Sequence, residues 1–174
     1  ITGCGPVGLG GVVNAKFRGA KVIVVEGLVY RQNKAIELGA DLVLSPDDPE
    51  LRKKIDSYTN GFGVDACLET AGVVAAQRLC IDVVKRKGQI SLIGECNEEL
   101  IVKASPDFIR KGIILRGQWH YNLNGTFRIM QVIQESPVVE KLITHVFPMS
   151  KIQDALEVSV THKCGKIILK PWED

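Results

Sequence analysis

The chain has 174 residues, of which 45% are hydrophobic and 24% charged. This composition is typical of a globular domain with one core, and it excludes disordered and fibrous proteins. The 22 Lys and Arg residues against 20 Asp and Glu leave a formal charge of +2 without a basic block. Neither nucleic acid nor an anionic membrane is therefore expected as a partner.

The sequence also indicates the compartment. No apolar run approaches the roughly 18 residues that a membrane span needs, and no charged head with an apolar stretch predicts a signal peptide. We therefore expect a cytoplasmic location. The five cysteines (Cys4, Cys67, Cys80, Cys96 and Cys164) contain no CxxC pair, and several lie in apolar runs. We expect neither disulfides nor a zinc knuckle, because such thiols behave as small hydrophobes.

The chain begins with ITGCGPVGLG, in which Ile1 and Thr2 read as the last residues of a β-strand whose earlier part is missing. We therefore expect a fragment of a longer protein. A helix is predicted over 7–18, with Pro6 at its start and Gly19 just past its end. The apolar run 21–26 then predicts a strand covered on both faces.

The alternation of helices and strands continues along the chain. Helices are predicted at 29–38, 49–58 and 73–86, strands at 41–45, 64–69, 88–95 and 112–117, and a short helix from Ser105-Pro106. Strands that alternate with helices of this length predict right-handed crossovers and a parallel sheet with helices on both faces. The predicted fold class is α/β, a doubly wound parallel sheet in the Rossmann order.

The regular alternation of strands and helices ends after Gly117. A helix is predicted at 124–135, an extended piece at 144–150, a helix at 151–160 and a strand at 166–171. Residues 118–174 do not extend the sheet neatly, so they either wrap around it or belong to a second domain. The predicted division is therefore 1–117 and 118–174.

Gly3, Gly5 and Gly8 form the pattern GxGxxG between a strand and a helix. The first glycine allows a tight turn, the second lets a pyrophosphate approach the backbone, and the third lets helix and strand pack closely. The helix N-terminus then favours phosphate. Glycines at these spacings also occur by chance in loops. The neighbouring residues therefore decide whether the pattern predicts a dinucleotide site.

The context is Glu26, at the end of the second predicted strand. A carboxylate there can accept hydrogen bonds from the adenosine ribose hydroxyls and would repel a 2′-phosphate, which favours NAD over NADP. The alternative is a solvated charge at a strand end. Arg31 could close over the adenosine edge, or it could be an exposed helix charge.

Several stretches occur together in a characteristic order: GCGPVGLG, the pair Glu26 and Arg31, IELGAD, GVDACLETAG, KGQISLIG and a final GKIILKP. In this order and spacing they resemble the medium-chain, zinc-dependent alcohol and polyol dehydrogenases over essentially the whole chain. The resemblance implies that 1–117 is the NAD-binding Rossmann domain with a truncated first strand. It also implies that 118–174 is the C-terminal return segment of a mostly absent catalytic domain.

The resemblance implies a set of cofactor contacts. They are Gly3, Gly5, Pro6, Val7 and Gly8 at the pyrophosphate turn, Glu26 and Arg31 at the ribose, Thr70, Ala71 and Gly72 after the fourth strand, Ile93, Gly94 and Glu95 after the fifth, Gln118 and Trp119 near the carboxamide, and Lys166 near the pyrophosphate. Each of three residues could instead have a structural role. Thr70 could be a polar group at a strand end, Trp119 a core aromatic and Lys166 a surface charge, and these alternatives are at least as probable as contact with the cofactor.

The resemblance also implies an activity. The parent enzyme would move a hydride between NAD and a small alcohol or polyol, with a zinc ion held by an N-terminal domain. This chain would bind NAD and contain no catalytic residue and no metal ligand. The apolar strand 112–117 would lie at a sheet edge and predicts a homodimer.

Other interpretations remain. A nucleotide-sensing regulatory domain also uses GxGxxG with an acid, although residues after Gly117 argue against it. A Rossmann-like methyltransferase fits the long helix entry and the GKIILKP ending poorly.

Tyr30 and Lys34 have the spacing of a short-chain dehydrogenase pair but lie too early in the chain. The three histidines (His120, His145 and His162) share no metal-ligand spacing. Glu69 and Glu95 would orient groups beside the nicotinamide.

Overall fold

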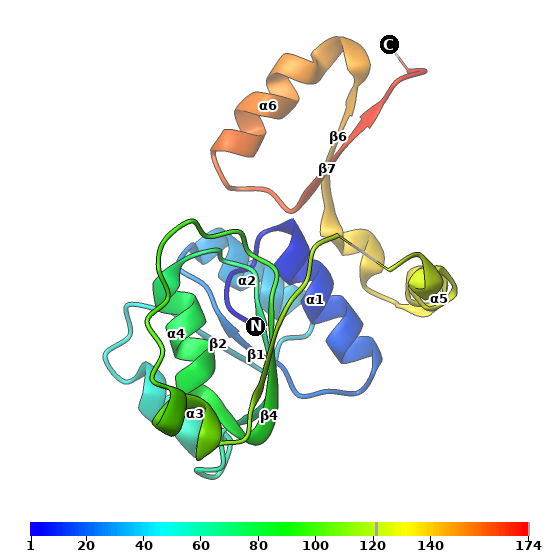
Figure 1. The fold of residues 1–174 in the computed structure, drawn as a ribbon. Coiled ribbons are helices and arrows are strands. Elements are labelled where there is room, and N and C mark those ends of the chain that lie inside the picture. Colours follow the sequence, from blue (N-terminus) through cyan, green and yellow to red (C-terminus); the bar gives the residue numbers. More distant parts are fainter. Residues whose placement is uncertain (121, 174) are drawn as a thin grey trace.

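The computed structural model describes residues 1–120 and 122–173. Five strands alternate with helices over the first part of the chain (Figure 1). The strands are β1 (Ile23–Val25), β2 (Leu42–Leu44), β3 (Val64–Glu69), β4 (Val84–Leu92) and β5 (Ile114–Gly117), and the helices are α1 (Pro6–Phe17), α2 (Val29–Glu37), α3 (Leu51–Tyr58), α4 (Val74–Val83) and a π-helix at Ala104–Ile109.

The strands form a parallel sheet that Thr2 joins in its middle. β1 pairs with β2, and β3 pairs with β4, which pairs with β5, all in parallel. Thr2 makes parallel bridges with Val25 of β1 and Glu69 of β3. The order across the sheet is therefore β2, β1, the segment at Thr2, β3, β4, β5. This is the Rossmann order that the sequence predicts.

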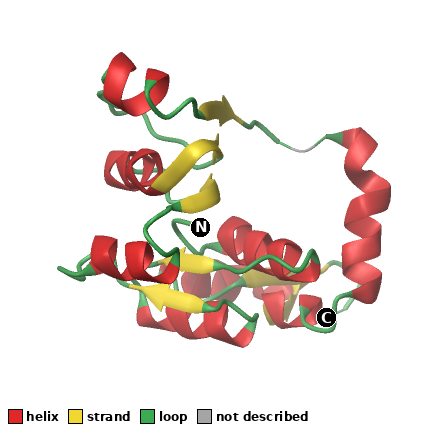
Figure 2. Ribbon diagram, turned by 90° about the horizontal axis from the view of Figure 1, so that it is seen from below, coloured by secondary structure: helices red, strands yellow, loops and turns green. Residues whose placement is uncertain are grey.

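Helices cover both faces of the sheet (Figure 2). On one face, Leu9, Val12 and Val13 of α1 pack with buried residues of β1 and α2. On the other face, Ile55 of α3 and Ile81 of α4 pack with residues of β3 and β4. Two apolar clusters on opposite faces confirm the doubly wound arrangement.

The boundary between α4 and β4 differs from the prediction. The sequence predicts a helix to Arg86, whereas α4 ends at Val83 and β4 begins at Val84. The Lys111 ammonium donates to the carbonyls of Ile81 (2.6 Å) and Asp82 (3.1 Å) at the end of α4. These bonds satisfy carbonyls that a helix end leaves free.

The last part of the chain builds a second small sheet. Its elements are α5 (Thr126–Glu135), β6 (Ile143–Pro148), α6 (Ile152–Val160) and β7 (Lys166–Lys170), with 3-10 turns at Leu123–Gly125, Val139–Leu142 and Met149–Lys151. β6 and β7 pair in parallel, and this part projects from the larger sheet (Figure 1). Val132 of α5 packs on the α1 face of the core.

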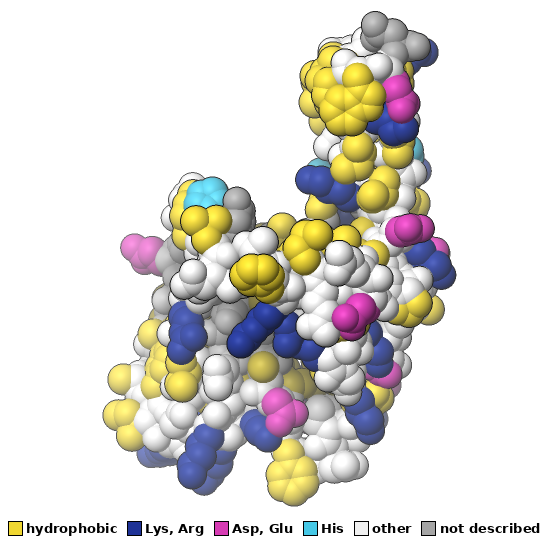
Figure 3. All heavy atoms as spheres, turned by 90° about the vertical axis from the view of Figure 1, so that its right-hand side faces the viewer, with side chains coloured by type: hydrophobic (Ala, Val, Ile, Leu, Met, Phe, Trp, Pro, Cys, Tyr) yellow, Lys and Arg dark blue, Asp and Glu magenta, His cyan; other side chains and the backbone are white. Residues whose placement is uncertain are grey.

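The projecting part carries hydrophobic side chains on its surface (Figure 3). Val160 is 74% exposed and Trp172 is 82% exposed. Among the described residues, no helix has both the length and the apolar character needed to cross a membrane.

Candidate functional site

The glycine turn leads from the middle of the sheet into α1. Gly3 has φ +80°, in the left-handed region that favours glycine, and its N–H donates to Val25 O (2.9 Å). Gly5 is the N-cap of α1 and Pro6 occupies its first turn. A Cβ at Gly8 would lie 2.0 Å from Gly3 O. The turn therefore requires glycine at the first and third positions of the pattern.

The N-terminus of α1 presents free backbone donors. The bond from Leu9 N to Gly5 O (2.9 Å) is one turn into the helix, so the N–H groups of Val7 and Gly8 precede the intrahelical bonds. The helix dipole adds a partial positive charge at the same end. Such an end binds phosphate readily.

Glu26 lies at the carboxyl end of β1, against the turn. Its Oε2 accepts the N–H of Cys4 (2.6 Å), and its Oε1 accepts the N–H of Leu28 (2.9 Å). Gln32 Nε2 donates to the Glu26 carbonyl (2.6 Å). The side chain is 8% exposed. These contacts fix the carboxylate in one orientation, and each oxygen keeps acceptor capacity for a further donor.

Arg31 reaches over the glycine turn from α2. Its terminal nitrogen lies 3.9 Å from the position that a Cβ at Gly5 would occupy. Its Nε is buried and has no hydrogen-bond partner among the described residues. A buried guanidinium N–H without an acceptor is costly. The unpaired donor therefore marks a place where an acceptor from a ligand would fit.

A cavity of about 650 Å³ opens beside these groups. Gly3, Gly5, Glu26 and Arg31 line it from the turn, β1 and α2. Residues that sequence analysis did not single out also line it, namely Pro46, Leu51, Val73, Ala75, Ala76, Arg78, Leu79 and Asp82. The sequence signal that could have found them is their place after the third and fourth predicted strands, where parallel sheets bind ligands. The volume suits a small-molecule ligand.

Thr70 and Glu69 hold the turn in place from β3. The Thr70 hydroxyl donates to the carbonyls of Thr2 (3.0 Å) and Gly3 (2.9 Å). Glu69 Oε1 accepts the N–H groups of Ala71 (2.8 Å) and Gly72 (2.9 Å). The Glu69 side chain is fully buried, and through these two bonds it orients the backbone of two predicted cofactor contacts. Its burial raises the pKa of the carboxyl, against the two backbone donors.

The loops after β3 and β4 touch each other. Gly72 has φ +70°, and a Cβ at Gly94 would lie 2.3 Å from Gly72 N. The N–H groups of Ile93 and Gly94 donate to Glu69 O (2.9 and 3.1 Å). The predicted contacts Thr70, Ala71 and Gly3 line the cavity, whereas Ile93 and Gly94 adjoin it through this loop contact.

The remaining predicted contacts lie farther along the chain. Gln118 N donates to Leu92 O (2.9 Å), which places it after β5 beside the end of β4. Trp119 is 70% exposed and meets the His120 ring edge-on at 4.8 Å, so it is not a core aromatic. Glu95 and Lys166 are exposed. None of these four side chains lines the cavity.

The described residues contain no group of three or more His, Cys, Asp or Glu side chains that could hold a metal ion. His145 hydrogen-bonds to the Thr144 hydroxyl (2.9 Å) and stacks on Phe147.

The fold and the turn define the class: a doubly wound α/β protein with a phosphate-type glycine turn and an acid at the end of the neighbouring strand. Residues 6–135 match the family model described as zinc-binding dehydrogenase. The chain belongs to this family.

Individual relatives agree. The chain is 31% identical to an L-threonine 3-dehydrogenase of Symbiobacterium thermophilum over 98% of this chain and 50% of the relative. A solved alcohol dehydrogenase of Thermotoga maritima superposes with a TM-score of 0.89 at 31% identity, covering 97% of this chain and 48% of the other. For 2R,3R-butanediol dehydrogenase of Bacillus subtilis the TM-score is 0.87 at 25% identity, with 98% and 49% covered. The chain spans about half the length of the relatives it matches.

Proposed function

We propose that this chain is the NAD-binding part of a zinc-dependent alcohol or polyol dehydrogenase and positions the nicotinamide for hydride transfer. The observation that carries the proposal is the place of Glu26. Its carboxylate is held against the glycine turn and lines the same cavity as Arg31. An acid in this place accepts hydrogen bonds from a ribose diol and repels a 2′-phosphate.

The residues present fit a dinucleotide. The N–H groups of Val7 and Gly8 would take the pyrophosphate, and the Glu26 carboxylate would accept from the adenosine ribose. The Arg31 guanidinium, which reaches over Gly5 with its terminal nitrogen and keeps an unpaired Nε, supports an acceptor group of the ligand beside it. When bound, NAD supplies the hydride acceptor.

The other expected contacts belong to the same proposal. Ala71, Gly72, Ile93, Gly94 and the backbone at Gln118 would shape the path toward the nicotinamide. We propose no catalytic residue in this chain.

We propose that the zinc ligands belong to a part of the enzyme other than the residues described above. No step of zinc catalysis is assigned to these residues, because the metal ligands are proposed to lie in another part of the enzyme. Because the matched relatives are about twice as long, we propose that a longer protein carries out the reaction and that this chain alone is inactive. In this proposal residues 1–117 bind the cofactor, and residues 118–174 return to the rest of the enzyme.

The proposed substrate is a small alcohol or polyol. The relatives named above include enzymes for threonine and for a butanediol, both of which carry a hydroxyl on a secondary carbon. We assign the cavity of this chain to the nucleotide. The residues that select the alcohol substrate are therefore proposed to lie outside this cavity.

We also propose a homodimer through β5. This strand pairs with β4 on one side, and Ile114 is 46% exposed. An apolar edge strand favours pairing with a second copy. The five free thiols favour a reducing compartment such as the cytoplasm.

The alternative is a regulatory domain that binds the same nucleotide without catalysis. The match to the family model reaches residue 135, beyond the nucleotide-binding fold itself, and favours the dehydrogenase.

A crystal structure of the chain with NAD tests the proposal. The expected result is adenosine ribose oxygens within hydrogen-bond distance of the Glu26 carboxylate and phosphates at the start of α1. NAD bound away from the glycine turn would overturn the assignment.

A further inference from the structure

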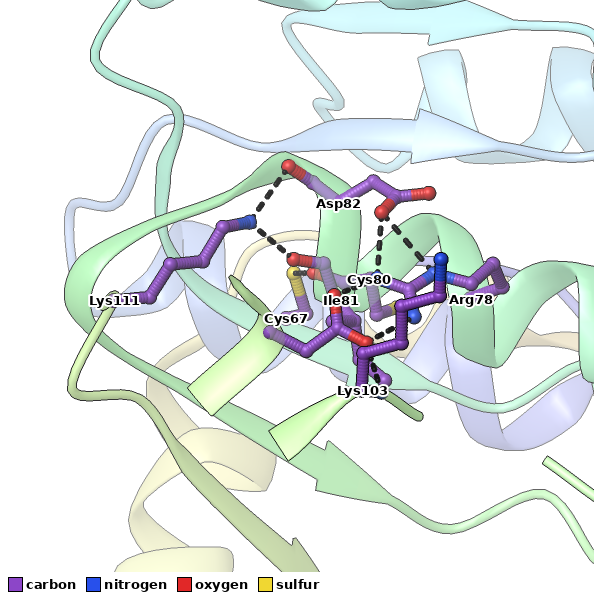
Figure 4. Close-up of polar contacts among 8 residues, drawn as sticks. Cys67, Arg78, Cys80, Ile81, Asp82, Lys103 and Lys111 are labelled. Atoms are coloured by element: carbon purple, nitrogen blue, oxygen red, sulfur yellow. Dashed lines mark hydrogen bonds and ion pairs between the residues drawn. The ribbon is translucent and has the colours of Figure 1, made fainter. Parts of the chain in front are cut away.

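The cavity beside the glycine turn also contains an ion pair on α4. Arg78 and Asp82 both line the cavity, and their side chains face each other across one turn of the helix (Figure 4). Arg78 donates from Nε (3.1 Å) and Nη2 (2.6 Å) to Asp82 Oδ1. The contacts proposed above for the pyrophosphate and the ribose use neither residue.

Asp107 holds the Arg78 guanidinium from a second side. The Asp107 carboxylate belongs to the π-helix and accepts from Arg78 Nη1 (2.8 Å) and Nη2 (3.1 Å). The backbone N–H of Lys103 donates to the same carboxylate (2.8 Å) and anchors it. With the two bonds to Asp82, four of the five N–H groups of the guanidinium are engaged. One N–H of Arg78 Nη1 is left for a ligand.

The Asp82 carboxylate has spare capacity as well. Its Oδ1 takes both bonds from Arg78, whereas its Oδ2 accepts no hydrogen bond from residues 1–120 and 122–173. The Asp82 side chain is 46% exposed. The pair therefore offers a ligand one donor, on Arg78, and one acceptor, on Asp82. Because the guanidinium is held on both sides, this donor and acceptor are preorganised.

The same cavity has apolar walls that suit a flat ring. Pro46 and Leu51 line it after β2, and Ala76 and Leu79 line it from α4. Hydrocarbon side chains favour the faces of an aromatic base over water. In the proposed function the adenosine ribose lies at Glu26, so the base attached to this ribose is the part of NAD that would enter between these walls.

We propose that Asp82 and Arg78 select adenine as the base of the nucleotide. The Asp82 carboxylate accepts a hydrogen bond from the N6 amino group, and the free N–H of Arg78 donates to the ring nitrogen beside it. Adenine carries this donor next to an acceptor. A base with a carbonyl oxygen at the same position would place an acceptor against the carboxylate. This inference rests on the proposed function and deepens it by naming the residues that recognise the base.

The test compares NAD with nicotinamide hypoxanthine dinucleotide, in which a carbonyl oxygen replaces the amino group of adenine. Calorimetric titration of the full chain should give an affinity for NAD about five- to tenfold higher. This is less than a buried hydrogen bond to a charged group would give, because Asp82 is half exposed. In Asp82→Asn the amide oxygen stays on Arg78, because a guanidinium only donates. The amide nitrogen then takes the place of Oδ2 and matches the carbonyl oxygen, so the preference should reverse.

Asp56→Asn is the matched control. Arg52 donates from Nε to both Asp56 oxygens (3.0 Å each) across one turn of α3, and neither residue lines the cavity. The substitution weakens an ion pair of the same kind, so the preference for NAD should be unchanged. A purely structural role of Asp82 would change both affinities together and leave their ratio constant.

The outcomes separate this inference from the proposed function. Equal affinity of the native chain for the two nucleotides overturns the selection of adenine, and so does a preference that Asp82→Asn retains or that Asp56→Asn also loses. If the native chain prefers NAD to NADP but does not distinguish the two bases, only this inference fails. If the native chain binds none of the three nucleotides, the proposed function fails and this inference fails with it.

Discussion

The carboxylate of Glu26 accepts a hydrogen bond of 2.6 Å from the backbone N–H of Cys4, inside the glycine turn. The end of β1 is thus tied directly to the loop that precedes α1. A bound nucleotide would meet the acid and the helix N-terminus as one preorganised unit, because neither has to move to reach the other.

The glycine turn makes a sharp stability prediction. Gly8→Ala places a methyl group 2.0 Å from the Gly3 carbonyl oxygen, which is backbone and cannot swing aside. We expect a loss of about 3 kcal/mol or more in the free energy of unfolding, at the upper end for overpacking. Denaturant unfolding measures it.

Gly10 is the matched control in the same helix. A Cβ there meets nothing within 4 Å. Gly10→Ala should raise the free energy of unfolding by about 0.5–1 kcal/mol, because alanine loses less backbone entropy in a helix. Equal effects of the two substitutions would contradict the described packing of the turn.

Asp107 gives a pH prediction. Arg78, which Figure 4 labels, donates to both of its oxygens (2.8 and 3.1 Å), and this pairing, with the Lys103 N–H, lowers the pKa of Asp107 to about 2. A lowered pKa in the folded state stabilises the protein above the usual pKa of about 3.9. This contribution is lost as the pH falls from there toward 2.

Asp107→Asn removes the titrating group. Thermal unfolding between neutral pH and pH 2 should show a smaller acid-induced loss of stability for the variant than for the native chain. Parallel pH profiles for the two proteins would show that the ion pair with Arg78 does not contribute.

Glu69 predicts the opposite pH dependence. Its fully buried carboxyl has a raised pKa because burial disfavours the charge. Its contribution to stability is therefore complete below the usual carboxyl pKa and is lost as the pH rises through the raised value. Its Oε2 is buried without a partner among the described residues.

Glu69→Gln keeps an acceptor for the N–H groups of Ala71 and Gly72 and cannot ionise. The difference in unfolding free energy, variant minus native, should increase from acidic to neutral pH. A difference that stays constant over this range would contradict a raised pKa.

The edge of β5 predicts the effect of a charge. Ile114→Lys should shift the chain toward monomer in sedimentation equilibrium, because an edge lysine opposes strand pairing between copies. Ile36→Lys, on the exposed face of α2, is the control, since Ile36 is 57% exposed and lies on no strand. A native chain that stays monomeric at high micromolar concentration would refute the dimer.

The sequence predicted the fold well where the periodicity of hydrophobic residues agrees with glycines at the ends of elements. Gly39, with φ +98°, follows the end of α2, and β3 spans the predicted residues 64–69. The prediction was wrong at the end of α4, where Val84, Lys85 and Arg86 belong to β4 and no glycine or proline separates the helix from the strand. Lys111, distant in sequence, donates to the Ile81 carbonyl at the end of the helix, a contact that no local pattern predicts.

The candidate site was only partly accessible from sequence. The spacing of the glycines and the place of Glu26 could be read, since both follow from local strand and helix patterns. The buried Arg31 Nε, the inward position of Glu69 and the pairing of Arg78 with Asp107 depend on packing between separate elements. No local pattern encodes those contacts.

The measurement that tests the central claim most directly is a calorimetric titration with NAD and, separately, with NADP, on the native chain, Glu26→Ala and Glu140→Ala. Glu140 is exposed and does not line the cavity. The native chain and Glu140→Ala should bind NAD more tightly than NADP. Glu26→Ala should lose this preference and bind NAD about tenfold more weakly or worse, since a hydrogen bond to a charged group contributes about 1.5–3 kcal/mol. Equal affinity of the native chain for both nucleotides, or a preference for NAD that survives in Glu26→Ala, would contradict the account.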